Sequence, residues 1–295
     1  MNYQTFLENV VQHVSASVHN GQKVVLQPVI KNNGMVYDGL VIMDPGLNIS
    51  PTIYLNPYYH RFLNGVSMDD IYKDILDTYY KNLPTKDFDI SSFRDFDKAS
   101  KMIAFKLINK EKNKILLDDV PYVEFQDLAL VFVCIVNNFR KEFATILIHN
   151  QHLHLWEIDI ETLYQIALEN TPKLLSYKFE NLEHLIFKGE REILSELQDF
   201  DMYILTNKLK IHGATCMVYP RLLKRISDFL EDNLVIIPSS IHEVLIIPES
   251  FTKGEYSMDE FKIMITEANE TTLTDDEILA DHAYFFERST GTLSY

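Results

Sequence analysis

The sequence predicts an α+β protein with mixed sheets and packed helices, and three patterns support this prediction. Residues Leu128–Val136 are apolar without alternation, which is typical of a strand covered on both faces. Apolar residues near the start recur every four positions, at Phe6, Val10, Val14 and Val18. This spacing places them on one stripe of a helix. Beyond residue 200, strands and helices are expected to alternate in the order βαββαβ, as in a ferredoxin-like unit.

After the first helix, the N-terminal part is expected to form a hairpin and a further strand. The runs Val24–Ile30 and Met35–Ile42 flank an Asn-Gly pair, which is a strong signal for a β-hairpin. Residues Pro51–Leu55 are predicted to add a third strand. A helix over Met68–Lys81 follows, because Ser67 can cap its first turn.

The central part is predicted to contain a second hairpin and a helix. Residues Ala144–Ile148 follow Leu128–Val136 across a short charged turn, so the two runs are expected to pair as interior strands. If Leu147–Trp156 is also extended, its side chains alternate between two faces. Asp159 is then expected to cap a helix that Thr171-Pro172 ends, because proline cannot donate to the helical ladder.

The C-terminal part is predicted to hold the βαββαβ succession. Two helical segments, 181–187 and 191–197, come before it. Its expected elements are strand Met202–Thr206, helix Pro220–Glu231, strand Leu234–Ile237, strand Val244–Pro248, helix Met258–Asn269 and strand Ala283–Glu287.

These segments suggest three regions. Residues 1–85 form an N-terminal α+β region, residues 86–175 a central hairpin and helix region, and residues 176–295 the C-terminal βαββαβ-like region. The polar and irregular stretch 82–93, which contains Pro84, is the predicted linker between the first two.

Composition narrows the class of protein. The formal net charge is −16, which repels phosphate backbones and argues against double-stranded nucleic acid as a partner. No apolar run approaches the roughly 20 residues of a membrane-spanning helix, and the first residues do not resemble a secretory signal. Cys134 and Cys216 lie among apolar neighbours without metal-binding spacing, as expected for buried thiols in a reducing cytoplasm.

A histidine cluster is the sharpest candidate for a metal site. On an extended strand, His152 and His154 would share one face, and His149 lies close by. A hydrolytic zinc site would also need a carboxylate, which Glu157 or Asp159 could supply, or the distant His242-Glu243 pair. The alternative is a group of half-exposed histidines at the end of a strand.

Two further groups have functional and structural interpretations. The run Ser239-Ser240-Ile241-His242-Glu243 contains the residue types of a catalytic triad but no nucleophile elbow, so an exposed hairpin loop is the simpler interpretation. The aromatic group is Tyr54, Tyr58, Tyr59, His60, Arg61 and Phe62. It could stack bases or anchor a peptide, or it could be the rim of a core.

Several motifs are missing from the sequence. There is no phosphate-binding Gly-x-x-x-x-Gly-Lys loop, no Gly-x-Gly-x-x-Gly and no His-Glu-x-x-His. With nine glycines in the whole chain, nucleotide chemistry is disfavoured and no cofactor is expected.

The sequence resembles, over nearly its whole length, a family of uncharacterised bacterial proteins from Gram-positive anaerobes, classed as a domain of unknown function. The most similar stretches are Ala144-Thr145-Ile146-Leu147-Ile148 with His152 and Trp156, Ala167-Leu168-Glu169-Asn170-Thr171-Pro172, Leu205-Thr206-Asn207, Gly213-Ala214 followed by Tyr219-Pro220, and Pro238-Ser239-Ser240-Ile241-His242-Glu243. The resemblance implies a shared fold and no activity.

Three hypotheses for function follow. The first is a soluble cytoplasmic binding or interaction module with a protein partner. Its candidate contact residues are Tyr54, Tyr58, His60, Arg61, Trp156, His242 and Glu243. The second is a metal-dependent hydrolase that uses His149, His152 and His154. The third is a protein that binds single-stranded nucleic acid through residues 54–62, with binding that weakens steeply in salt.

Overall fold

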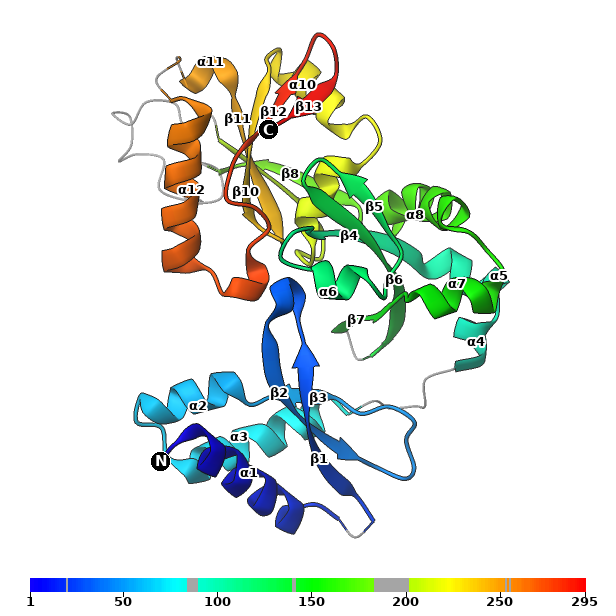
Figure 1. Cartoon of the computed structure of the whole chain (residues 1–295), viewed down its shortest axis with the longest axis vertical. Helices are drawn as coiled ribbons and strands as arrows, with labels where there is room; N and C mark the ends of the chain where they lie inside the picture. The colour runs from blue at the N-terminus through cyan, green and yellow to red at the C-terminus, as the bar shows by residue number, and fades with distance from the viewer. Residues whose placement is uncertain (20, 84–89, 140–141, 183–201, 253, 255) are drawn as a thin grey trace. The chain divides into compact units, whose positions relative to one another are not determined.

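The computed structural model describes residues 1–295 except 20, 84–89, 140–141, 183–201, 253 and 255 (Figure 1). The chain forms two compact units: unit 1 comprises Met1–Arg94 and Ile135–Thr145, and unit 2 comprises Asp95–Cys134 and Ile146–Tyr295. Both combine helices with sheets, which confirms the α+β class. The first boundary lies between Arg94 and Asp95. Within the stretch 82–93, which was expected to be irregular, the last residues belong to a short helix over Ile90–Arg94.

Unit 1 contains a three-stranded sheet and helices. Its elements are α1 (Tyr3–Ser17), β1 (Lys23–Ile30), the 3₁₀ turn η1 (Asn32–Gly34), β2 (Val36–Met43), β3 (Thr52–Tyr54), α2 (Asn56–Leu63), α3 (Met68–Lys81) and α4 (Ile90–Arg94). The segment Ile135–Thr145, which consists of the joined ends of β6 (Leu128–Phe139) and β7 (Glu142–Leu147), also belongs to this unit.

The predicted hairpin of unit 1 is confirmed. Strands β1 and β2 pair antiparallel from Lys23–Met43 to Ile30–Val36, and β3 pairs with β2. At the turn, Asn33 and Gly34 both have positive φ, which explains the strength of the Asn-Gly signal. The apolar stripe predicted for α1 is buried with apolar residues of α3 in a core with the sheet. The fully buried members are Phe6, Val10, Val14, Leu40, Ile42, Leu55, Ile71, Ile75 and Tyr79.

Unit 2 contains two sheets and most of the helices. Its elements are α5 (Phe96–Ala99), η2 (Ser100–Met102), β4 (Ile103–Asn109), α6 (Lys114–Leu117), β5 (Tyr122–Phe125), most of β6 with the end of β7, α7 (Asn150–Trp156), α8 (Ile160–Leu174), β8 (Tyr177–Asn181), β9 (Tyr203–Asn207), η3 (Gly213–Val218), α10 (Leu222–Leu230), β10 (Leu234–Ser240), β11 (Glu243–Pro248), α11 (Glu249–Thr252), α12 (Met258–Thr272), η4 (Asp275–Glu277), β12 (Tyr284–Glu287) and β13 (Thr292–Ser294).

Strand β6 is the centre of the first sheet of unit 2. It pairs antiparallel with β4 on one side and β5 on the other, and β7 also pairs with it. Every residue of Leu128–Val136 is at most 6% exposed, as expected for a strand covered on both faces. The predicted pairing of the two apolar runs is confirmed by the contact of β7 with β6. The second run is not an interior strand, because Thr145 is exposed and Ile146 and Leu147 are half-buried.

The second sheet has the order β13-β12-β10-β11-β9-β8. The predicted βαββαβ succession is present as β9, α10, β10, β11, α12 and β12, and β8 and β13 extend the sheet at its two edges. Helix α12 buries Phe261 and Ile265 against Val235 and Ile247 of the central strands.

The two sheets of unit 2 are joined through β4. The N–H groups of Phe105 and Leu107, on the edge of β4 away from β6, donate to the hydroxyl oxygens of Thr171 and Thr215. Thr171 lies on α8, and Thr215 lies on η3 beside the second sheet. Hydroxyl oxygens from α8 and η3 thus provide the hydrogen-bond acceptors that a neighbouring strand would otherwise provide to β4.

Two expected elements of the central part differ in the structure, and two expected helices lie largely outside the described residues. Leu147–Trp156 is not extended, because Asn150–Trp156 form α7. Helix α8 does not end at Thr171-Pro172 but continues to Leu174, since a proline in the last turn removes only one hydrogen bond. Of the helices expected at 181–187 and 191–197, residues 183–197 lie outside the described residues, and Tyr177–Asn181 form β8.

Candidate functional site

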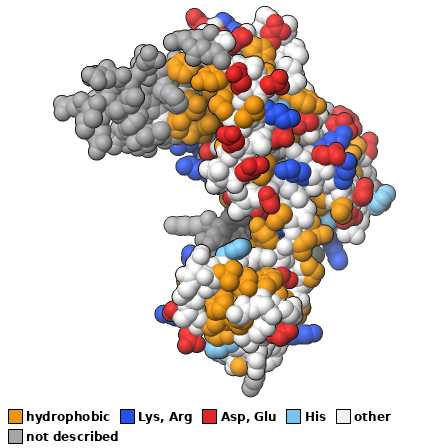
Figure 2. Space-filling model, turned by 60° about the vertical axis from the view of Figure 1, so that its left-hand side comes forward, with side chains coloured by type: hydrophobic (Ala, Val, Ile, Leu, Met, Phe, Trp, Pro, Cys, Tyr) orange, Lys and Arg blue, Asp and Glu red, His pale blue; other side chains and the backbone are white. Residues whose placement is uncertain are grey.

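An apolar cleft lies in unit 2 between helix α12 and the second sheet. Its volume is about 390 Å³. The lining residues are Met202, Ile237, Ile247, Phe251, Thr252, Tyr256, Phe261, Met264, Ile265 and Ala268. In the space-filling view, hydrophobic side chains gather in the upper part of the molecule, where α12 lies (Figure 2). The cleft has the size and character of a pocket for apolar groups.

The local sequence explains how α12 forms one wall. Ser257 and Glu260 form a capping box: the Ser257 hydroxyl accepts from the Glu260 N–H over 3.3 Å, and the Glu260 carboxylate accepts from the Ser257 N–H over 2.7 Å. The helix then buries Phe261 and Ile265. Met264 and Ala268 lie on the helix face next to this buried stripe. Both line the cleft, and both are exposed to solvent.

The polar groups of the cleft are few. The Thr252 hydroxyl donates to the carbonyl oxygen of Glu249 over 2.7 Å and is therefore satisfied within α11. Tyr256, which is 50% exposed, carries the other hydroxyl of the lining, and its ring contacts Phe261 at 5.8 Å. Among the described residues, the lining contains no carboxylate, histidine, cysteine or lysine, so these residues suit apolar groups and offer no acid, base or strong nucleophile.

The histidine cluster lies at the start of α7. The Nδ1 atom of His149 lies 2.6 Å from Oδ2 of Asp119, and the His149 N–H donates to Nδ1 of His152 over 2.9 Å. The His152 ring packs near the rings of His149 and Trp156, with centroids 5.6 and 5.9 Å away. Burial, aided by repulsion from His149, lowers the pKa of His152, while Asp119 opposes this shift.

The structure therefore brings His149 and His152 together but leaves His154 apart. In a helix, residues two apart point in nearly opposite directions, and His154 is exposed in the last turn of α7. The shared face expected for His152 and His154 was wrong, because it depended on an extended chain. Within the part of the chain that the structure describes, no three His, Cys, Asp or Glu side chains are grouped to hold a metal ion.

The carboxylates expected to complete that site have structural roles. Glu157 is the left-handed residue that ends α7, with φ of 54°. Asp159 caps α8 by accepting from the N–H of Thr162 over 2.8 Å, and the bonds to Thr162 lower its pKa.

His242 lies in a hydrogen-bonded loop. Its Nδ1 accepts from the N–H of His212 over 3.2 Å, and its N–H donates to the hydroxyl of Ser240 over 3.0 Å. Its carbonyl oxygen accepts from the Thr206 hydroxyl over 2.8 Å. The polar atoms of Ser240 and His242 bond mainly to backbone groups, as expected of a hairpin loop. The expected exposure of this loop was wrong, because Ser240 and Ile241 are each only 7% exposed. Glu243 begins β11 beside this loop.

This loop unites three of the stretches on which the family resemblance rests. Thr206-Asn207, Gly213-Ala214 and the Ser240–Glu243 turn meet here, and the Ala214 N–H donates to the carbonyl of Ile241 over 3.3 Å. A Cβ atom on Gly213 would lie 2.1 Å from Oγ1 of Thr206, which explains the glycine. The residues of these three stretches therefore build the fold at this place.

In unit 1, the predicted aromatic group separates into two parts. Tyr54 on β3 makes an edge-on contact with Tyr37 at 5.7 Å between ring centroids. The Lys31 ammonium lies 4.0 Å from the centroid of Tyr54. This is a favourable cation–aromatic contact.

The other part of the group lies between α2 and α3. The Tyr58 hydroxyl is 3.1 Å from that of Thr78, and Arg61 forms an ion pair with Asp74 at 2.5 Å. His60 is exposed. Tyr58 and Arg61 thus connect two helices, so the aromatic group does not present one continuous surface.

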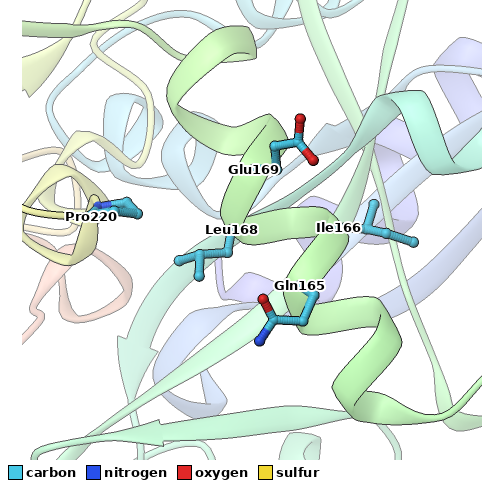
Figure 3. A pocket seen from close by; sticks show the side chains of 5 residues that line it. All are labelled: Gln165, Ile166, Leu168, Glu169 and Pro220. Carbon is cyan, nitrogen blue, oxygen red and sulfur yellow. The ribbon is translucent and has the colours of Figure 1, made fainter.

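A shallower groove runs along α8. Its volume is about 410 Å³, and its lining is Gln165, Ile166, Leu168, Glu169 and Pro220. Figure 3 shows that Leu168 points toward Pro220, whereas Ile166 points to the other side of the helix. Glu169 pairs with Lys173 at 2.6 Å. Because these side chains do not converge on one point, the groove is a weaker candidate than the cleft beside α12.

The fold is that of an α+β protein of two units with an apolar cleft in unit 2. Residues 3–288 match the model of a family of unknown function, DUF5688, and the chain belongs to this family. No match was found among the curated proteins or among the solved structures. In the described part of the chain, no helix combines the length and the apolar character that crossing a bilayer requires.

Proposed function

We propose that this protein is a binding module whose cleft beside α12 receives the apolar face of a basic amphipathic helix from a protein partner. The observation that carries this proposal is the combination of an apolar cleft with an acidic helix along its edge. Binding of a helix in such a groove is a common mode of peptide recognition.

The apolar character of the cleft supports burial of hydrophobic side chains. Eight of the ten lining residues carry no hydroxyl group, and Met202 and Met264 can adapt to different shapes because their side chains are flexible. Met264 is 42% exposed, so a partner would remove further apolar surface from water.

The charges along α12 support a basic partner. The exposed polar residues of this helix include Asp259, Glu260, Glu267 and Glu270, with Lys262 as the basic member. The bonds from Ser257 lower the pKa of Glu260, so its carboxylate is ionised at neutral pH. Together with a net charge of −16 for the chain, this distribution favours a partner with lysine or arginine beside its apolar stripe.

We also propose a cytoplasmic location for this soluble module. Cys134 and Cys216 are both buried free thiols, which fits a reducing compartment. The hydrolase hypothesis has no comparable support in the described residues, because it needs at least three metal ligands at one point.

The test is selection of peptides from a displayed random helical library on the full-length protein. We expect enrichment of amphipathic sequences with basic polar faces. Affinity for a selected peptide should fall at least about tenfold in Met264→Glu, because a buried unpaired charge costs more than 1.4 kcal/mol. Ile263→Glu is the matched control, since Ile263 is the adjacent residue, is 59% exposed and does not line the cleft.

Two results would contradict the proposal. One is enrichment of acidic peptides or of no common pattern. The other is an equal loss of affinity in the Ile263 and Met264 variants, provided that circular dichroism shows both to be folded. Binding that survives Met264→Glu would place the contact elsewhere on the chain.

A further inference from the structure

A cluster of ionisable and aromatic side chains connects the turn between β5 and β6 to the C-terminal hairpin β12–β13. The Tyr284 hydroxyl donates to Oδ1 of Asp127 over 2.6 Å. The other carboxylate oxygen, Oδ2, lies 3.5 Å from Nε2 of His282. On the opposite side of the ring, Nδ1 of His282 lies 3.1 Å from Oδ1 of Asp281. The His282 ring thus lies between two carboxylates.

The hairpin has further attachments: Tyr284 and Phe286 are at most 5% exposed, and the Arg288 N–H donates to Oδ1 of Asn233 over 2.8 Å. Its β12 strand pairs with β10 through three residues, and β13 pairs only with β12 in the described sheet. Gln126, next to Asp127, donates to the carbonyl of Leu293 over 2.9 Å. The Tyr295 ring packs 5.0 Å from that of His282. Short strands at a sheet edge open locally more often than the core.

The burial of the cluster makes its charges important. The side chains of His282 and Asp127 are 17% and 24% exposed. The carboxylates of Asp127 and Asp281 raise the pKa of His282 above its ordinary 6.5, although burial opposes them. Desolvation would raise the pKa of Asp127, but the neighbouring His282 and the hydrogen bond from Tyr284 lower it.

We propose that the Asp127–His282 ion pair is a pH-sensitive clasp, closed in mildly acidic solution, which releases the β12–β13 hairpin from the β5–β6 turn as the pH rises above neutrality. When His282 loses its proton, Asp127 and Asp281 face a neutral ring, and the hairpin opens more often.

The pH window follows from the two ionisations. His282 contributes stability fully below its ordinary pKa of 6.5 and loses it as the pH rises through the higher value of the folded protein. Asp127 contributes stability above its ordinary pKa of 3.8, and this stability is lost only as the pH falls through the lower pKa of the folded protein. The clasp is therefore strongest between these ordinary values and weakens as the pH rises through the raised pKa of His282.

The neighbouring ionisable groups do not change the direction of the pH dependence of the clasp. Tyr284 has a strongly raised pKa because it is buried, so it stays protonated throughout the window. Lys262 on α12 acts on Asp281 and helps His282 lower the pKa of that carboxyl. Tyr295 provides a ring contact. His282 is thus the group of the cluster that changes charge near neutrality.

The test is hydrogen exchange of the full-length protein at pH 6.0 and pH 8.5, with exchange times scaled for the intrinsic pH dependence. We expect protection of peptides covering 284–295 to fall about fivefold between the two pH values. His282→Gln and Asp127→Asn should both remove this fall. Asp127→Asn keeps an acceptor oxygen for Tyr284 and therefore preserves the buried hydrogen bond. His154→Gln, which changes an exposed histidine elsewhere, should leave the fall unchanged.

Equal protection of the wild-type hairpin at both pH values would overturn the proposal. The same fall in His282→Gln would also overturn it, because another group would then be responsible. A second measurement is the ring titration of His282 by NMR. Its midpoint should lie above the ordinary value of 6.5 and should drop in Asp127→Asn; an unchanged midpoint in that variant contradicts the clasp.

Discussion

The backbone N–H of Phe105 donates to Oγ1 of Thr171 over 3.0 Å, within the core and between residues 66 apart in sequence. Thr171 is fully buried, and its hydroxyl donates in turn to the carbonyl of Ala167 over 2.6 Å. One side chain thus satisfies an N–H group of β4 that no strand reaches. The same relationship joins Leu107 to Thr215.

We expect Thr171→Val to lower the free energy of unfolding by about 1–3 kcal/mol, because valine has the shape of threonine but leaves the Phe105 N–H buried without an acceptor. Urea unfolding measures the change. Thr171→Ser keeps the acceptor oxygen, so its free energy of unfolding should fall less than that of Thr171→Val. A valine variant as stable as the serine variant would show that the hydrogen bond adds nothing.

At the start of α7, the side chain of His152 accepts the N–H of the capping residue His149. We expect His152→Ala to destabilise the protein by about 1 kcal/mol, the usual value of a helix cap. His152→Gln should recover much of this loss, since glutamine at this position can make the same bond. The comparison is again by urea unfolding, and equal losses in the two variants would rule out a capping role.

The lowered pKa of His152 predicts a pH effect opposite in sign to that of His282. The folded protein prefers neutral His152, whereas the unfolded chain takes up a proton near the ordinary 6.5, so stability is lost as the pH falls below that value. The wild-type protein should therefore lose more stability between pH 8 and pH 5 than His152→Gln does. A larger loss in the variant would contradict this assignment.

The same titration has an optical readout. Trp156 is the only tryptophan of the chain, and its ring lies 5.9 Å from that of His152. A protonated imidazole quenches a neighbouring indole, so Trp156 emission should decrease with a midpoint below 6.5 while the protein remains folded. His152→Gln should abolish this step.

Gly213 is expected to tolerate no side chain. A Cβ atom would lie 2.3 Å from the carbonyl oxygen of His242, in addition to its clash with Thr206, so backbone must move. We predict that Gly213→Ala costs about 3 kcal/mol in the free energy of unfolding. Gly46→Ala is the control, because its nearest neighbour is an Asp44 side-chain atom at 3.2 Å, and it should cost less than about 0.5 kcal/mol.

The two thiols should be inert in the folded protein. Burial raises the pKa to about 11 for Cys134 and to about 12 for Cys216, so neither is a thiolate at neutral pH. Under native conditions at pH 8, a disulfide reagent should react with the two thiols only as fast as the protein unfolds. In denaturant, it should react with both thiols rapidly. Rapid labelling of either thiol under native conditions would contradict the buried positions.

Patterns that depend on a whole element were predictable from the sequence. The central strand Leu128–Val136 has a continuous apolar run because both faces are covered, and the stripe of α1 follows from one buried face. The Asn33-Gly34 turn was predictable because few residues adopt positive φ readily. Each of these signals is local in the chain.

The candidate sites were less predictable, for two physical reasons. His149–Trp156 has histidine and leucine spacing that fits either a strand or a short helix, and the choice depends on bonds to His152 and Asp119 that form only in the fold. The cleft also combines residues from β10, β11, α11 and α12, so no single segment reveals it. Its one local signal is the wide apolar face of α12, where Met264 and Ala268 adjoin the buried stripe.

The bond between Tyr284 and Asp127 also bears on the order in which the chain folds. It joins residues 157 apart in sequence, and unit 2 begins at Asp95 but is completed by strands near residue 290. During synthesis, the β5–β6 turn therefore leaves the ribosome long before its partner strand exists. Contacts of such long range slow folding and leave apolar surface exposed meanwhile. We infer that nascent chains shortened before Tyr284 are the ones that depend most on chaperones.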